Sequence, residues 1–283
     1  MKKIAVVTDS ACDLSSKTIE EYGIYQIPLK IIYKNAEYLD KVTISSKEMY
    51  ARLNQEVPTT SLPDVEYAQG VIQSIIDEGY TDILVVCIST QLSGTLNSLK
   101  IICEEYTNVN FYFIDSKTLG YPEGVVAVEV AKYVKAGLSI EEILNKVPGI
   151  QKRLHGYINV DSLDHLIKGG RLSKTAGAVG TILNFKPIIG IDHEKGILYS
   201  ESKPRGRKKA FSELIDILKN VLKRSKCEVW VLTGDADSEA KDFYNQIKDF
   251  EGITQISIEE IGAAMGIHTG PGVVGLVILE AEK

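Results

Sequence analysis

The sequence predicts an α/β fold with two domains, with a parallel sheet in the first and a mixed sheet in the second. Its 283 residues are more than one hydrophobic core usually holds, and the common domain size indicates about two domains. The first half alternates apolar runs with helical stretches, which is typical of a parallel sheet. The second half contains two apolar runs joined by a short turn, which is typical of a β-hairpin.

Composition excludes several classes of protein. A net charge of -6 gives little electrostatic support for a nucleic-acid partner. No apolar run approaches the roughly 20 residues that span a bilayer, and the first residues lack the apolar segment of a signal peptide. We therefore expect a cytoplasmic protein without a transmembrane segment, for which transient contact with a membrane surface stays open. The cysteines are too widely spaced for a zinc site, so we expect no metal and predict buried thiols at Cys12, Cys87, Cys103 and Cys227.

Predicted strands and helices alternate through the first half. Ser45 with Glu48 and Ser139 with Glu142 have the spacing of capping boxes, which start helices. From the apolar runs and helical patterns we expect strands at 3–7, 27–33, 85–88 and 109–115, and helices at 17–22, 65–77 and 124–135. This order of elements predicts the parallel sheet of the first domain.

Residues 85–98 supply the first candidate ligand contacts. The apolar run stops in hydroxyl residues and restarts as a helix near Thr95. The free N–H groups of a helix start, the hydroxyls of Ser93 and Thr95 and the permissive backbone of Gly94 suit a carboxylate or phosphate. Ser and Thr are also common N-caps, so capping alone explains them equally well. A second polar group follows the strand at 3–7, at the edge where α/β sheets usually bind ligands, and consists of Thr8, Asp9 and Ser10.

Residues 58–64 supply a second set of candidates. Pro58 and Pro63 enclose three hydroxyl residues and predict a rigid turn that leads into the helix at 65–77. Ser61 suits the role of N-cap of that helix. Thr60 has no such structural role, which makes it the stronger candidate for contact with a ligand.

The second half has a different order of elements. We expect the domains to be 1–150 and 151–283, with the boundary near 147–149 or at 154–155. A turn that contains Arg171 should lead into a helix of small residues at 176–180. The other predicted elements are strands at 155–160, 186–192, 197–202, 228–232, 253–258 and 274–279, and helices at 163–168, 208–224 and 239–248. Because 186–192 and 197–202 form a hairpin, the sheet of this domain should be mixed.

Two further features of the second half are candidates for function. Cations gather on an otherwise acidic chain, where they either solvate a helix face or bind a partner. Residues 266–275 form a glycine-rich loop in which His268 should be exposed. It could donate a hydrogen bond to a ligand head group, and a solvated loop histidine is an equally good explanation. The cationic cluster comprises Lys203, Arg205, Arg207, Lys208 and Lys209.

Seven motifs taken together carry a resemblance to a known family. They are Thr8-Asp9-Ser10, Thr60-Ser61-x-Pro63, Ser93-Gly94-Thr95, Asp115-Ser116, Gly170-Arg171-Leu172-Ser173, Lys203-x-Arg205-x-Arg207-Lys208-Lys209 and His268-x-Gly270-Pro271-Gly272. With these motifs, which run nearly from end to end, the chain resembles the DegV family of bacterial fatty-acid-binding proteins. The resemblance implies an α/β/α domain followed by a two-layer mixed domain.

The resemblance also implies a ligand and a partner. It implies one buried long-chain fatty acid, such as palmitate, no other cofactor, and a role in lipid transport or fatty acid metabolism. The carboxylate would be held by Thr60 and Ser93, and the ligand-binding candidates are Thr60, Ser93, Ser61, Gly94, Arg171 and His268. Some relatives present the carboxylate to a separate ATP-dependent fatty acid kinase subunit, which makes the acyl phosphate. Contacts with such a partner or its phosphate are expected from Arg205 and Arg207.

Other functions have weaker support in the sequence. A serine-dependent acyl hydrolase is the alternative, but Leu92-Ser93-Gly94 lacks the G-x-S-x-G frame of a nucleophile elbow. Histidines elsewhere could still act as the base. An ATP-binding kinase is disfavoured because no G-x-x-x-x-G-K-[ST] stretch occurs, and DNA binding has only the cationic cluster in its favour. We therefore expect a fatty-acid-binding protein rather than an enzyme.

Overall fold

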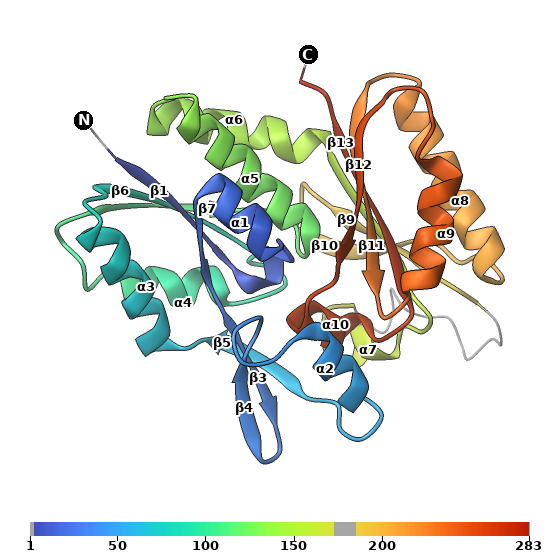
Figure 1. Cartoon of the computed structure of the whole chain (residues 1–283), viewed down its shortest axis with the longest axis horizontal. Helices are drawn as coiled ribbons and strands as arrows, with labels where there is room; N and C mark the ends of the chain where they lie inside the picture. Colours follow the sequence, from blue (N-terminus) through green and yellow to red (C-terminus); the bar gives the residue numbers. More distant parts are fainter. Residues whose placement is uncertain (1–2, 173–184, 283) are drawn as a thin grey trace.

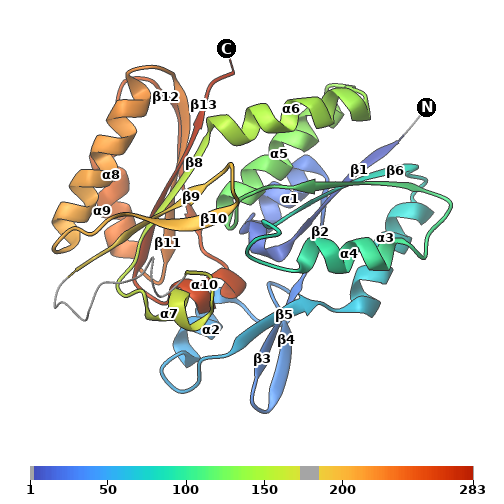
Figure 2. The same cartoon turned by 180° about the vertical axis from the view of Figure 1, so that it is seen from behind.

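The computed structural model describes residues 3–172 and 185–282. The helix predicted at 176–180 lies outside these residues. Figure 1 shows two large sheets side by side, with α5 and α6 packed between their upper parts. From behind, Figure 2 shows a small third sheet, made of β3, β4 and β5, below the parallel sheet. A cluster of short helices, α2, α7 and α10, lies beside this small sheet.

The first large sheet is entirely parallel, as predicted. Its strands, in spatial order, are β2 (Ile24–Ile27), β1 (Ile4–Asp9), β6 (Asp82–Cys87) and β7 (Asn110–Asp115). Successive side chains of a strand point to opposite faces. Val6 accordingly packs toward α5, whereas Ala5 and Val7 pack toward α3 and α4. The flanking helices are α1 (Ser16–Tyr22), α5 (Tyr121–Lys135) and α6 (Ile140–Arg153) on one face, and α3 (Val65–Asp77) and α4 (Thr95–Cys103) on the other.

The second large sheet is mixed, which confirms the prediction. Its strands, in spatial order, are β10 (Ile197–Ser202), β9 (Ile188–Asp192), β8 (Leu154–Asn159), β13 (Val273–Glu280), β11 (Cys227–Gly234) and β12 (Ile253–Glu260). All neighbours are antiparallel except β11 and β12. The predicted hairpin is β9 with β10. The outer face of the sheet is covered by α8 (Arg207–Leu222) and α9 (Asp237–Ile247), as Figure 1 shows.

The small sheet corrects two predictions. It consists of β4 (Ala36–Leu39), β3 (Leu29–Tyr33) and β5 (Thr59–Pro63), all antiparallel. The single strand expected at 27–33 is divided at Pro28 between β2 and β3. The rigid turn expected at 58–64 is instead β5, in which Thr60 pairs with Ile31. Pro63 is tolerated there because it is the last residue of the strand, next to a break in register.

Helix capping was predicted correctly at two sites and wrongly at a third. The capping boxes at Ser45 and Ser139 are both present. Ser61 does not cap α3, because it still lies in β5. The cap is Asp64, whose Oδ1 accepts a hydrogen bond of 3.0 Å from the N–H of Tyr67. The remaining short elements are η1 (Ser10–Cys12), α2 (Ser46–Arg52), α7 (Asp164–Lys168) and α10 (Ala263–Thr269).

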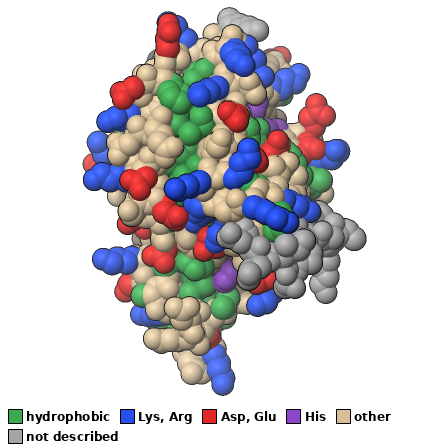
Figure 3. Space-filling model, turned by 90° about the vertical axis from the view of Figure 1, so that its right-hand side faces the viewer, with side chains coloured by type: hydrophobic (Ala, Val, Ile, Leu, Met, Phe, Trp, Pro, Cys, Tyr) green, Lys and Arg blue, Asp and Glu red, His purple; other side chains and the backbone are tan. Residues whose placement is uncertain are grey.

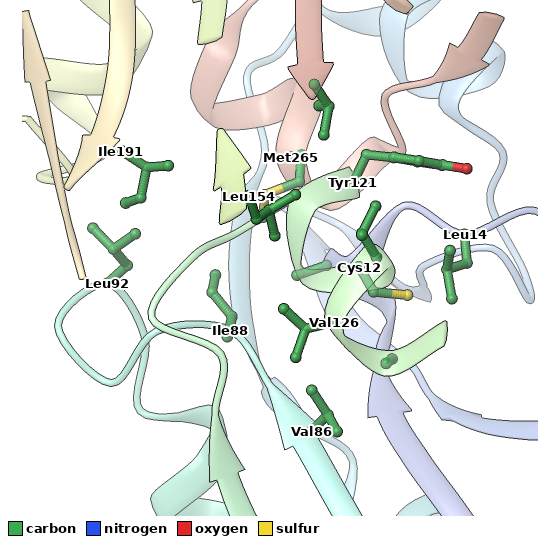
Figure 4. Packing of buried hydrophobic residues seen from close by; sticks show 14 of the residues in the cluster. Cys12, Leu14, Val86, Ile88, Leu92, Tyr121, Val126, Leu154, Ile191 and Met265 are labelled. Carbon is green, nitrogen blue, oxygen red and sulfur yellow. The ribbon is translucent and has the colours of Figure 1, made fainter. Parts of the chain in front are cut away.

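One cluster of buried side chains joins the two large sheets. Figure 4 shows Leu92, which follows β6, close to Ile191 of β9, and the same cluster contains Ile88 and Met265 of α10. Helix α6 runs through the residues where a domain boundary was expected, and β8 begins directly after it. The position of the boundary stays a prediction. The cysteines are buried free thiols, as predicted: Cys12, Cys87, Cys103 and Cys227.

Charge and hydropathy at the surface are mixed. On the face shown in Figure 3, Lys and Arg side chains are interspersed with Asp and Glu. The coloured part of this face therefore lacks the continuous basic stripe that is typical of a nucleic-acid interface. Within 3–172 and 185–282, every helix is too short or too polar to cross a bilayer.

Candidate functional site

An apolar cavity lies between the two large sheets. About 860 Å³ of it is free of protein atoms, including its opening to solvent, but only about 80 Å³ can hold the centre of a water molecule. The cavity is therefore a narrow passage. Its apolar wall comes from both halves of the chain and includes Leu29, Ile88, Leu92, Leu119, Tyr121, Ile158, Ile189, Ile191, Leu198, Leu232, Met265 and Val277.

The mixed sheet supplies one wall because of its strand alternation. On β9, Ile189 and Ile191 belong to the cluster that faces the cavity, whereas Ile188 packs on the outer face beside α8. On β8, Ile158 lines the cavity in the same way, opposite Ile189 in the ladder. Branched apolar side chains at every second position thus form an apolar wall of the cavity.

Four polar residues that the sequence singled out line the cavity together. They are Thr60, Ser93, Arg171 and His268. Thr60 Oγ1 lies 2.8 Å from His268 Nε2. The Ser93 hydroxyl lies 2.8 Å from that of Thr95 and accepts a hydrogen bond of 3.3 Å from the N–H of Thr95. The N-cap residue of α4 is Gly94, so Ser93 lies just before the cap and borders the cavity.

His268 is buried, which corrects the expectation of an exposed loop residue. Only 9% of its surface is accessible, because residues 263–269 form α10 instead of continuing the glycine-rich loop. Burial, with smaller effects from Arg171 and His165, lowers the pKa of His268 to about 4. The imidazole is therefore neutral at pH 7. If Nε2–H donates to Thr60, the Thr60 hydroxyl keeps its own hydrogen to donate to a ligand.

Arg171 supplies the positive charge at this end of the cavity. Its Nε donates to the carbonyl oxygen of Leu92 at 3.3 Å, and its Nη1 donates to that of Gly169 at 2.7 Å. Burial lowers its pKa, but an arginine stays charged in proteins. A guanidinium beside two hydroxyls suits a carboxylate, because hydrogen bonds to ionised groups are about twice as strong as neutral ones.

The other four predicted residues lie outside the cavity wall. Ser61 and Gly94 are exposed neighbours of Thr60 and Ser93, and neither lines the cavity. Arg205 is exposed, with its guanidinium carbon 5.3 Å from the centre of the Phe185 ring.

Arg207 is already engaged with its own chain. Its Nη2 lies 2.9 Å from Glu239 Oε2 and 3.1 Å from Asp161 Oδ1. Its Nη1 donates to Asn159 Oδ1 at 2.7 Å. These contacts join the start of α8 to α9 and to the end of β8.

Asp9 supports the loop that carries Ser93. Its Oδ1 accepts from the N–H of Ala11 at 2.9 Å, and its Oδ2 accepts from the N–H of Ile88 at 3.2 Å. Burial raises the pKa of Asp9 to about 6, although these hydrogen bonds lower it. Asp9 contacts the backbone just before the loop, as expected of a residue that supports the site.

Sequence reasoning missed several cavity residues. The apolar residues were assigned to the core, because nothing in a sequence distinguishes a side chain that lines a cavity from one that fills a core. Asp13 and Thr269 also line the cavity and were not singled out. Asp13 had a usable signal, because it lies only three residues after the polar group at Thr8–Ser10.

In the described part of the chain, the hydrogen bonds of the Ser93 hydroxyl join it to Thr95 and not to a base. Ser93 has Thr95 as its hydroxyl partner, while His268 bonds Thr60. The arrangement of a nucleophile beside its base is therefore not formed at Ser93. Within the described ranges, His, Cys, Asp and Glu side chains nowhere group in threes that could hold a metal ion.

Comparisons with known proteins identify the family of the chain. The model of the DegV family matches residues 3–281. A DegV domain-containing protein of Clostridium acetobutylicum is 40% identical over 280 residues, which cover 99% of this chain and 100% of that protein.

Solved structures extend the similarity to the fold. A DegV lipid-binding protein from Thermotoga maritima has a TM-score of 0.88 at 28% identity, with 100% of both chains covered. A stearic acid-binding protein from Eubacterium ventriosum has a TM-score of 0.85 at 28% identity, with 99% of this chain and 98% of that chain covered. Because the family model spans nearly the whole sequence and a relative above 30% identity is covered from end to end, the chain belongs to the DegV family.

Proposed function

We propose that this protein binds one long-chain fatty acid, such as palmitate, with its acyl chain in the cavity and its carboxylate at Thr60 and Ser93. The observation that carries the proposal is the pairing of a narrow apolar passage with a small group of donors. That group includes the Thr60 hydroxyl, 2.8 Å from His268, and the charged Arg171. The similarity to proteins described as lipid-binding and stearic acid-binding supports the same ligand class.

The energetics favour a long acyl chain over a short polar ligand. Each methylene group that leaves water contributes about 0.8 kcal/mol, so most of the affinity would come from the apolar wall. The carboxylate would exchange water for hydroxyl and guanidinium donors, which fixes its orientation more than it adds affinity. A ligand without a long apolar part would leave most of the wall unused.

Purified protein provides the test. We expect native mass spectrometry to show one bound fatty acid per chain, and solvent extraction to release it for identification. Protein freed of lipid should then bind palmitate or oleate at one site. An empty preparation that binds neither fatty acid would refute the proposal. Short acyl esters should not be turned over, and turnover would favour the hydrolase alternative.

A more specific part of the proposal is that a kinase subunit acts on the bound fatty acid. Ser61 and Gly94 are exposed beside Thr60 and Ser93, so the proposed carboxylate position lies near the surface. This supports access by an ATP-dependent kinase subunit that would form the acyl phosphate. The exposed Arg205 would take part in docking, whereas Arg207 would have to leave its contacts with Glu239 to do so.

Charge reversal at the cationic cluster tests the proposed kinase partner. In a reconstituted assay with a kinase subunit, Arg205→Glu combined with Lys209→Glu should abolish acyl phosphate formation. Fatty-acid affinity should change by less than about 0.5 kcal/mol, as for other surface substitutions. Unchanged phosphorylation, or an equal loss of fatty-acid affinity, would show that these residues have another role.

A further inference from the structure

The cavity wall contains one carboxyl group among its described residues, that of Asp13. The residue is 5% exposed. Its Oδ1 accepts a hydrogen bond of 2.9 Å from the N–H of Gly262. Its Oδ2 lies 3.4 Å from the point where a Cβ would stand on Gly120, which is another residue of the cavity wall. One oxygen is thus committed to the protein, and the other has no protein donor among the described residues.

The backbone holds Asp13 in place. Its φ of 53° lies in the left-handed region, which is uncommon for a residue with a side chain and persists only where the surrounding structure requires it. Gly262 is the N-cap residue of α10, so the hydrogen bond to Asp13 also anchors the helix that carries His268. The carboxyl position is therefore fixed by two neighbouring segments.

Asp13 is well separated from the proposed carboxylate site. Gly262 and His268 stand at opposite ends of α10, and six residues of helix correspond to about 9 Å. Asp13 also borders an open groove beside α1, so its carboxyl lies between that groove and the cavity. An acyl chain that starts at Thr60 and follows α10 would pass Asp13 near its middle.

We propose that Asp13 is a second polar subsite of the cavity, which accepts a hydrogen bond from a hydroxyl group in the middle of the acyl chain. The preferred ligands would then be mid-chain hydroxylated long-chain fatty acids. This inference rests on the proposed function. Its physical basis is that the second carboxyl oxygen of Asp13 can accept a hydrogen bond from a ligand hydroxyl, and that a site which hydrogen-bonds a hydroxyl discriminates against a ligand that lacks one.

A hydroxyl fits this subsite better than a cationic group. Burial raises the pKa of Asp13 to about 7, and the nearby charge of Lys41 opposes this rise. The Nζ of Lys41 donates to the carbonyl oxygen of Leu14 at 2.8 Å. A second cation beside Lys41 would be repelled, whereas a neutral hydroxyl would not. A hydroxyl can also hydrogen-bond to either protonation state of the carboxyl group.

The test compares positional isomers on lipid-free protein. Dissociation constants are measured for stearate and for stearates that carry a hydroxyl near the carboxylate, near the middle or at the far end of the chain. We expect a mid-chain isomer to bind about 5- to 100-fold more tightly than stearate. The other isomers should bind no better than stearate. If stearate binds and no isomer binds better, the inference is wrong while the proposed function stands. If nothing binds, both fail.

Variants assign the effect to the carboxyl group. Asp13→Gly keeps the left-handed backbone without strain and should abolish the preference for the mid-chain isomer. Asp13→Asn keeps an acceptor for Gly262 but removes the charge, and it should reduce the preference at least threefold, since charge-assisted hydrogen bonds are the stronger ones. The matched control is Asp40→Asn, which changes a fully buried carboxyl near the start of α10 that does not line the cavity. A preference that survives both Asp13 variants, or is lost in the control alone, would overturn the assignment.

Discussion

Thr60 Oγ1 and His268 Nε2 lie 2.8 Å apart although 208 residues separate them in the sequence. The contact joins β5 of the small sheet to α10, which leads into the central strand β13 of the mixed sheet. The polar end of the cavity is thus assembled from segments of both halves of the chain. Substitutions at these residues should affect ligand binding more than they affect either sheet.

Removal of single hydroxyls at this end should weaken fatty-acid binding. We expect Thr60→Val and Ser93→Ala each to cost about 1.5–3 kcal/mol, the range for hydrogen bonds to a charged group. Val keeps the shape of Thr and its preference for a strand. Displacement of a fluorescent fatty acid from lipid-free protein measures the change. The matched control is Ser61→Ala, an exposed neighbour in β5, which should stay within about 0.5 kcal/mol. Equal affinities in all three variants would place the carboxylate elsewhere.

The cap of α3 provides a test of stability rather than binding. Asp64 accepts a hydrogen bond from the N–H of Tyr67, whereas Ser61 makes no cap. Asp64→Ala should therefore lower the free energy of unfolding by about 1 kcal/mol, and Ser61→Ala should leave it nearly unchanged. Urea denaturation measures both. The reverse order would mean that Ser61 supports the helix after all.

Local signals in the sequence were enough for much of the fold. The apolar run at 85–88 predicts a buried strand, which lies within and just after β6 (Asp82–Cys87), and the pairs at Ser45 and Ser139 predict helix starts. The interactions involved lie within a few residues. The mixed sheet followed from the hairpin signal at 193–196. These features do not depend on which distant segment packs against them.

Features that depend on distant partners were missed. Prolines and hydroxyl residues at 58–64 favour a turn on local preference, yet β5 forms because it pairs with β3. His268 looked exposed because glycines surround it, yet α10 forms because it packs against α2. Local sequence made Thr60, Ser93 and His268 candidates, and the resemblance to a family added Arg171. Their meeting in one cavity could not be derived from spacing.

The buried His268 should make stability depend on pH. In the unfolded chain a histidine has a pKa near 6.5, and in the folded protein the pKa of His268 is about 4. As pH falls through this interval, the unfolded state binds the proton first, so the folded state loses stability. The loss from this residue should reach about 2.5 kcal/mol between pH 7.5 and pH 4.5.

Comparison with His268→Gln isolates that share of the loss. Glutamine can hydrogen-bond to Thr60 but does not titrate. The difference in the free energy of unfolding between the variant and the wild type should therefore shift in favour of the variant as the pH is lowered. The half-buried His193, whose pKa is also lowered to about 4, contributes equally to both proteins and cancels. A difference that stays constant from pH 7.5 to pH 4.5 would contradict the buried neutral state.

Gly156 on β8 lies close to Pro122, and this contact should limit the width of the cavity. A Cβ added there would stand 2.8 Å from Cγ of Pro122, at the start of α5, and both residues line the cavity. Pro122 cannot move without shifting α5, so Gly156→Ala should lower the free energy of unfolding by about 1–3 kcal/mol. The matched control is Gly149→Ala in α6, where a Cβ would meet no atom within 4 Å. Ala is the better helix former, so this variant should gain roughly 0.5–1 kcal/mol.

The same substitution should discriminate between ligands by length. The far end of β8, at Asn159, leads into α7, whose His165 Nδ1 lies 3.1 Å from the carbonyl oxygen of Ile267 in α10. Gly156 lies three residues before Asn159 and therefore about 10 Å further from the polar end. A short acyl chain bound at Thr60 would end before this point, whereas a long chain would reach it. Titration of Gly156→Ala should thus show a larger loss of affinity for stearate than for octanoate, and equal losses would mean that the acyl chain takes another path.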